Sequence, residues 1–339
     1  MTAFGDIERR RRGAKSSYKD IKKHYVRLNG WLPVFQTYFK LRAGEPHYLT
    51  LCAKDAIDVR YFRQKGLLPY DKQEKAYPTV AFVEKDAQDY ASIAEGLGTT
   101  KLGIKGDLEE ILVKPEENAE NSQRLRDSFP YDIINLDFTG EVVRADDPPY
   151  SQTIRAIERI IELQYAADCE QWHMFLTFRA CPQTSNHEAD QELRTIIEGN
   201  LQNAVAQAAY GIRLVPDELA RHQYEEFIRV GVTKFLAFSS PNRGYACSLG
   251  GSYAYPRNPD IGPAYHIVKL IVGFRAIRST RNLPNPNATR AAYEESVQQI
   301  FRSQAVDVNT ALGSPVVRQA LKDDLQPVLD ELQRQNIID

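Results

Sequence analysis

The chain has 339 residues, of which 42% are hydrophobic and 26% are charged, so it is long enough to bury a substantial core. Its formal net charge of -2 gives no overall attraction to nucleic acid or to acidic membranes, so any such preference must be local. No apolar run reaches the roughly 18 residues of a membrane span, and the amino terminus is charged where a signal peptide is apolar, which predicts a protein without a membrane partner.

The four cysteines are widely separated in the sequence and form no C-x-x-C pair; they are Cys52, Cys169, Cys181 and Cys247. This spacing argues against a disulfide framework and against a thiolate zinc site. Histidine motifs typical of metal sites, such as H-E-x-x-H, are also absent from the sequence. We therefore expect a cytoplasmic protein without a bound metal.

The first segment, residues 1–45, combines a basic arm with an amphipathic helix expected at 31–42. Aromatic residues are interleaved with the later charges, and the only acid among residues 9–27 is Asp20. Such an arm contacts the phosphates of nucleic acid or an acidic partner, or else it is simply solvated. The basic residues that would carry this contact are Arg9, Arg10, Arg11, Arg12, Lys15, Lys19, Lys22 and Lys23, followed by Arg27.

From His47 onward, apolar strands alternate with amphipathic helices, and Asp55 or Asp58 could cap the first of these helices. This alternation implies right-handed crossovers and a mostly parallel sheet covered on both faces, which is a doubly wound, Rossmann-like α/β fold. Strands are expected at 48–53, 79–83, 101–104, 131–137 and 173–178, and helices at 57–68, 87–97, 108–112 and 151–165.

The second half of the chain is less regular. Residues 183–230 are predicted to form a helical insertion within a domain that spans 46–280. Two further strands are expected at 232–238 and 265–274, joined by a Gly-rich aromatic segment in which Ser248 to Ser252 forms a hairpin turn. Residues 281–339 are predicted to form a polar, helical carboxyl-terminal extension.

Acidic residues stand at the ends of the expected second, third and fourth strands. The clearest is Asp137, which closes a nearly all-apolar strand that includes Ile134 and Leu136. Open α/β sheets bind ligands at the carboxyl ends of their strands, so Asp137 is a candidate functional residue, although an acid there could also cap the next turn.

The ordered acids Glu84, Asp107 and Asp137 resemble the landmarks of class I S-adenosylmethionine-dependent methyltransferases. The resemblance implies that Glu84 holds the ribose hydroxyls of S-adenosylmethionine, that Asp107 approaches the adenine amine, and that Asp137 stands beside the methyl donor. The segment 131–140 is similar to strand four of tRNA guanine-N2 dimethyltransferases, with Phe138 where that family has proline; Phe138 would stack on the target base.

The turn after the first strand departs from the family pattern. By resemblance Cys52, Ala53 and Asp55 would lie against the cofactor, but residues 52–58 contain no glycine. Glycines in this turn normally let the backbone approach the ligand, and here Lys54 and Asp55 would crowd it. This departure leaves open an inactive member of the fold that binds a protein or nucleic-acid partner within a larger assembly.

A second motif, Asp147-Pro148-Pro149-Tyr150, spells the Asp-Pro-Pro-Tyr of methyltransferases that act on the amino groups of adenine or cytosine. By that resemblance Asp147 and Tyr150 would be catalytic, with the acid accepting from the exocyclic amine and the ring stacking on a flipped base. The alternative is that Asp147 caps the helix at 151–165 and that the prolines occupy its first turn.

The sequence therefore predicts a protein that transfers a methyl group from S-adenosylmethionine to nucleic acid, with the inactive binding subunit as the main alternative. A dehydrogenase that uses the same sheet would also need the missing glycines, and no catalytic pair suggests one.

Overall fold

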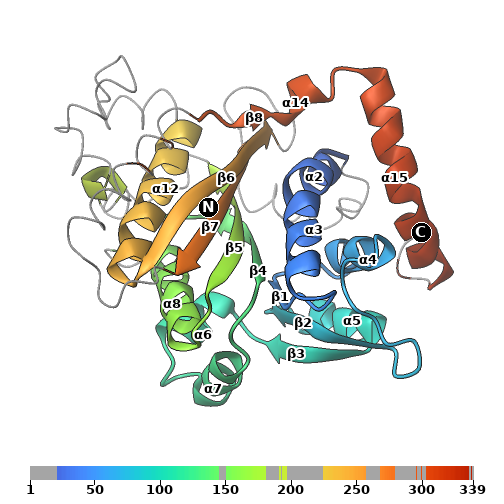
Figure 1. Cartoon of the computed structure of the whole chain (residues 1–339), viewed down its shortest axis with the longest axis horizontal. Coiled ribbons are helices and arrows are strands. Elements are labelled where there is room, and N and C mark those ends of the chain that lie inside the picture. The colour runs from blue at the N-terminus through green and yellow to red at the C-terminus, as the bar shows by residue number, and fades with distance from the viewer. Residues whose placement is uncertain are drawn as a thin grey trace, which may run out of the picture.

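The computed structural model of the chain describes residues 21–144, 150–180, 191, 193–196, 224–256, 268–278, 295, 299, 303–335 and 337. Within these residues an eight-stranded sheet has the order β3-β2-β1-β4-β5-β7-β6-β8 (Figure 1). The strands are β1 (Tyr48–Thr50), β2 (Ala76–Glu84), β3 (Thr99–Lys105), β4 (Ile133–Glu141), β5 (Gln171–Ala180), β6 (Tyr245–Pro256), β7 (Val268–Arg278) and β8 (Val306–Asp307).

The first five strands run parallel to one another, whereas β7 is antiparallel to both of its neighbours, β5 and β6. The strand β1 pairs with β2 on one side and with β4 on the other, so the sheet is built outward in both directions from β1. The expected doubly wound, Rossmann-like α/β fold is therefore confirmed. Its topological switch point, where such sheets bind ligands, lies between β1 and β4.

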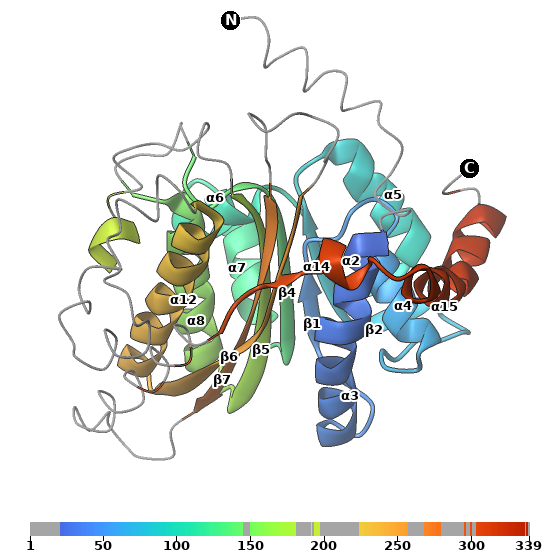
Figure 2. The same cartoon turned by 90° about the horizontal axis from the view of Figure 1, so that it is seen from above.

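Helices cover both faces of the sheet (Figure 2). One face packs against α3 (Leu32–Leu41), α4 (Ile57–Gln64) and α5 (Ala87–Leu97), together with α2 (Ile21–Val26) and the π-helical segment η2 (Arg27–Trp31). The helix α15 (Pro315–Arg334) packs on the outer side of α2 and α4. The other face packs against α6 (Leu108–Val113), α7 (Ala119–Asp127), α8 (Gln152–Ala166) and α12 (Tyr224–Asn242). A short helix, α14 (Val308–Ala311), precedes α15, and no helix in these described parts of the chain is long and apolar enough to cross a membrane.

Local sequence explains where several of these elements begin. The Asp86 carboxylate accepts from the backbone N–H groups of Gln88 and Asp89 at 2.8 and 2.9 Å and thereby caps α5. Ser151 caps α8 by accepting from the N–H of Ile154 at 3.1 Å, so the predicted cap of this helix by Asp147 is wrong. Neither Asp55 nor Asp58 caps α4, because Ala56 occupies the cap position with a φ of 43°.

The expected strand at 232–238 lies inside α12, a helix whose residues are mostly buried. A short apolar run that is buried all round looks the same in a helix and in a strand, which explains the wrong prediction. The expected turn at Ser248 to Ser252 is part of β6, whose register against β7 shifts between Leu249 and Ser252. Glycine is needed at this bulge, because a Cβ on Gly250 would lie 3.3 Å from the backbone of Gly273.

The carboxyl-terminal helix α15 joins the amino-terminal helix α2 to α4. Asp324 of α15 accepts from the hydroxyl of Tyr61 at 2.7 Å and lies 3.0 Å from Nε2 of His24 on α2. On the same helix, Glu331 accepts from the buried Arg60 at 2.8 Å. Segments that are about 300 positions apart in sequence (|i−j| = 300 for His24 and Asp324) thus hold one another in place.

The fully buried His24 provides a pH-dependent test of this packing. Burial lowers the pKa of His24 from 6.5 to about 4, so the unfolded state takes up a proton first as the pH falls. The stability that neutral His24 contributes is therefore complete above pH 6.5 and is lost progressively toward pH 4. Lowering the pH from 7 to 5 should reduce the free energy of unfolding of both proteins. We predict that the reduction is ~2 kcal/mol larger in the wild type than in the His24→Gln variant.

Urea unfolding of both proteins at the two pH values measures this difference, and the other titrating groups cancel because both proteins carry them. Equal losses in the two proteins would show that His24 does not titrate differently in the folded and unfolded states.

Candidate functional site

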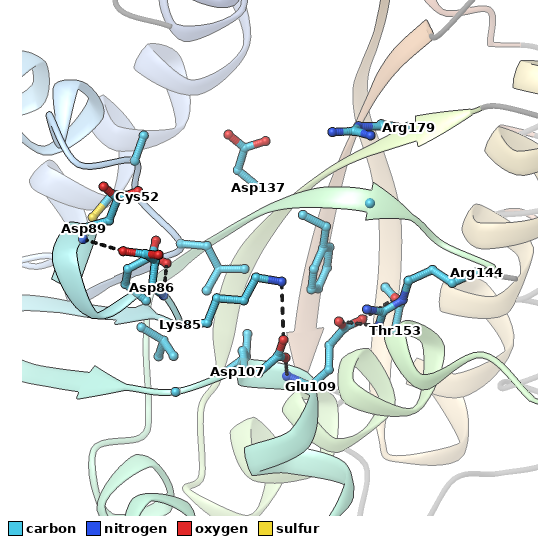
Figure 3. Close-up of a pocket in the computed structure, with 18 of the residues that line it drawn as sticks. Cys52, Lys85, Asp86, Asp89, Asp107, Glu109, Asp137, Arg144, Thr153 and Arg179 are labelled. Atoms are coloured by element: carbon cyan, nitrogen blue, oxygen red, sulfur yellow. Dashed lines mark hydrogen bonds and ion pairs between the residues drawn. The ribbon is translucent and has the colours of Figure 1, made fainter. Parts of the chain in front are cut away.

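A cavity of about 530 Å³ opens at the carboxyl ends of the central strands. It brings together the three predicted acids Glu84, Asp107 and Asp137, which come from β2, from the turn after β3 and from β4. Figure 3 shows the positions of Asp107 and Asp137. Cys52 and Ala53 line the same cavity. The structure therefore has a cavity at the edge of the sheet where the sequence predicts a ligand site.

Glu84 is held by the backbone that follows its strand. Its Oε1 accepts from the N–H of Asp86 at 2.8 Å, in the turn between β2 and α5. Burial raises the pKa of the Glu84 carboxyl, and the hydrogen bonds from the backbone oppose this shift. A half-buried carboxylate fixed at a strand end can accept two hydroxyl groups of a sugar without reorienting.

Asp107 is the N-cap residue of α6 as well as a residue of the cavity wall. Its Oδ1 caps α6 by accepting from the N–H of Glu109 at 2.9 Å. Its Oδ2 lies 3.6 Å from Nζ of Lys85, which also lines the cavity. Asp107 is therefore placed at the cavity wall, with one oxygen engaged by the helix and the other near a cation.

The turn after β1 leaves the large cavity open although it contains no glycine. Lys54 is exposed and does not line the cavity, while Asp55 is buried and lines a small second cavity next to Asp137 instead. The left-handed backbone at Ala56 redirects the chain into α4. The predicted crowding by Lys54 and Asp55 therefore does not close the space beside Glu84.

Hydrogen bonds to Asp58 attach this turn to the central strands of the sheet. Its Oδ2 accepts from the hydroxyl of Tyr48 at 2.6 Å, from the hydroxyl of Thr50 at 2.9 Å and from Nδ2 of Asn135 at 3.3 Å. These donors belong to β1 and β4, so a single buried carboxylate joins α4 to the two central strands. In addition, burial raises the pKa of the neighbouring Cys52 thiol, which makes this cysteine a poor nucleophile.

The basic amino-terminal segment lies directly on the site. Lys23 of α2 forms an ion pair with Asp137, and each of the two side chains is only 15% exposed. A second cavity beside this pair has a volume of only about 10 Å³ and is lined by Arg27, Trp31 and Asp55, among others. Lys23 was predicted to contact phosphates; in the structure its ammonium neutralises the carboxylate of Asp137. Arg9 to Lys19 lie outside the described residues.

The two aromatic candidates differ in position. Phe138 is buried and lines the large cavity next to Asp137. Tyr150 is 40% exposed, does not line the cavity, and has the guanidinium of Arg155 5.5 Å from the centre of its ring. Asp147 lies outside the described residues, so the geometry supports the aromatic assignment for Phe138 more than for Tyr150.

The far wall of the cavity carries residues that the sequence reasoning missed. The buried Glu109 accepts from Arg144 and from the hydroxyl of Thr153, and burial raises the pKa of its carboxyl. Arg179, near the end of β5, also lines the cavity. Its place at the carboxyl end of a parallel strand was the one signal that could have identified it.

The described residues contain no group of three or more histidine, cysteine, aspartate and glutamate side chains that could hold a metal ion. None of Cys52, Cys169 and Cys247 takes part in a disulfide bond.

A double-mutant cycle on Lys23 and Asp137 measures how strongly the amino-terminal segment is bound to the site. Lys23→Met keeps the apolar stem but removes the ammonium that pairs with Asp137, and Asp137→Asn removes the carboxylate charge that pairs with Lys23. Because the pair is largely shielded from water, we predict a coupling free energy of about 1–3 kcal/mol in urea unfolding. A coupling near zero would show that solvent screens the pair and that α2 does not depend on it.

Comparison with known proteins gives a partial match. Residues 104–255 match the model of a protein family described as PP_RS20740-like. The matched region begins in β3 and ends in β6, so it contains Asp107, Asp137, Phe138 and Arg179 but not Glu84. No curated protein matches the chain.

Proposed function

We propose that the chain binds S-adenosylmethionine in the large cavity and transfers its methyl group to nucleic acid. The observation that carries this proposal is the open space of about 530 Å³ beside Glu84, at the switch point of the sheet. The antiparallel pair of β6 and β7 adds support, because methyltransferases of class I end in a hairpin of this kind.

The residues of the cavity fit the nucleoside end of this cofactor. Glu84 would accept from the two ribose hydroxyls, and Asp107 would lie near the adenine amine. The fit is tighter beside Asp137, where Lys23 and Trp31 leave only about 10 Å³, so binding of the methionine end requires α2 to move away from Asp137.

S-adenosylmethionine, when bound, supplies an activated methyl group for an in-line displacement. The protein then has to position the acceptor rather than perform acid–base chemistry. Asp137 would accept a hydrogen bond from the acceptor amine once Lys23 has left it, and Phe138 would stack on the base. Both side chains stand on β4, a central strand, which keeps their relative position fixed.

A second function, that of an inactive binding subunit, is favoured by the ion pair between Lys23 and Asp137. If α2 stayed in place, Asp137 could not meet an acceptor amine, and the space for the methionine end would remain filled. The protein would then bind a protein or nucleic-acid partner through its surface, and the cavity would hold no cofactor.

Titration calorimetry with S-adenosylmethionine distinguishes the two functions. We predict micromolar binding to the wild type and at least tenfold weaker binding to Glu84→Ala, because hydrogen bonds to a charged carboxylate contribute ~1.5–3 kcal/mol. Glu95→Ala, which removes an exposed acid from α5, is the matched control and should bind as the wild type does.

Absence of heat with the wild type would favour the inactive subunit. Equal affinities of the wild type and Glu84→Ala would show that Glu84 does not hold the ribose. Thermal unfolding of each variant confirms that it is folded.

A further inference from the structure

Two arginines, Arg144 and Arg179, line the large cavity on the side of β4 and β5 (Figure 3). Carboxylates line both sides of this cavity: Asp107 on the side of β3, and Glu109 and Glu141 on the side of the arginines. Arg144 is paired with Glu109. Arg179 has no hydrogen bond or ion pair with any residue in the part of the chain that the structure describes, and its Nε is buried without a partner.

Register places Arg179 on the same face as Asp137. Thr177 of β5 is opposite Asp137 of β4, and Arg179 follows two residues later, so both side chains point to the same side of the sheet. Adjacent strands are about 4.8 Å apart. Arg179 therefore stands one strand beyond Asp137 and closer to the open edge, and Figure 3 shows the two side chains on the same side of β4.

An arginine in this state is suited to an anionic ligand. Its guanidinium does not lose its charge in proteins, so burying an Nε–H without an acceptor is costly, and the cost is recovered when an acceptor arrives. The planar fork of arginine matches the geometry of phosphate.

We propose that Arg179 forms a phosphate subsite that holds the phosphodiester next to the target nucleotide. The proposal rests on the function proposed above, and it specifies the acceptor. The base of that nucleotide would lie at Asp137, turned out of any stack, while its backbone passes over the end of β5. Single-stranded nucleic acid is the favoured acceptor, because an unpaired base enters a cavity without the cost of opening a duplex.

Fluorescence anisotropy with a mixed-sequence 12-mer, prepared as single-stranded RNA and as DNA, tests this subsite on the full-length protein. We predict that Arg179→Gln weakens binding at least tenfold and lowers the salt slope of log K by about 0.7, which corresponds to one phosphate contact on a single strand. Arg126→Gln is the matched control, because Arg126 is exposed on α7 at the opposite edge of the sheet. It should bind as the wild type does.

Arg179→Lys keeps the positive charge but loses the planar fork of the guanidinium. Binding of the 12-mer that is weaker than that of the wild type and stronger than that of Arg179→Gln would support the subsite. This variant also keeps the test valid if Arg179→Gln does not fold. Competition with inorganic phosphate and with adenosine 5′-monophosphate distinguishes the source of the phosphate. Displacement of the 12-mer at micromolar mononucleotide would overturn the assignment to a nucleic-acid strand.

Parallel calorimetry with S-adenosylmethionine separates this inference from the proposed function. Cofactor binding by the wild type together with unchanged 12-mer binding by Arg179→Gln would overturn the phosphate subsite alone. Arg179-dependent 12-mer binding without cofactor binding would support the subsite and reject the methyl transfer. Absence of 12-mer binding to the wild type would also overturn the subsite.

Discussion

The buried carboxylate of Asp58 is the constraint on which the open cavity depends. It accepts hydrogen bonds from Tyr48, Thr50 and Asn135, and so it ties α4 to β1 and β4 at the switch point of the sheet. In many proteins with this type of sheet, glycines let the first turn pass close to the ligand. Here three side-chain hydrogen bonds and the left-handed Ala56 hold the turn, and the space beside Glu84 stays open.

The amino-terminal segment determines how much of this edge is accessible. Lys23 covers Asp137, while His24, the next residue, is held by Asp324 of α15. Arg27 is buried in the π-helical segment, and two of its guanidinium nitrogens have no partner within the described residues. Unsatisfied donors and a single π-turn mark a segment that is not at its energetic optimum, which is consistent with a cover that moves when a ligand binds.

Much of the fold could be predicted from the sequence, because the alternation of apolar strands and amphipathic helices is clear, although the predicted caps at Asp55 or Asp58 and at Asp147 were wrong. The helix α5 has the predicted bounds, and the nearly all-apolar start of β4 forms the predicted strand, buried on both faces. Glu84, Asp107 and Asp137 converge because the carboxyl ends of parallel strands share one edge. Lys23 could not be placed at the site from sequence, since its position depends on packing between distant segments. Arg179 was missed although it lies at the carboxyl end of β5. The strand expected at 232–238 was wrong because burial on all sides removes the helical period of α12.

The most direct test of this account is a crystal structure of the protein with S-adenosylhomocysteine. The account predicts the ribose at Glu84, the adenine near Asp107, and α2 displaced so that Lys23 no longer contacts Asp137. Crystals that take up no ligand under saturating concentrations, with the ion pair of Lys23 and Asp137 unchanged, would contradict it and would identify this edge of the sheet as closed.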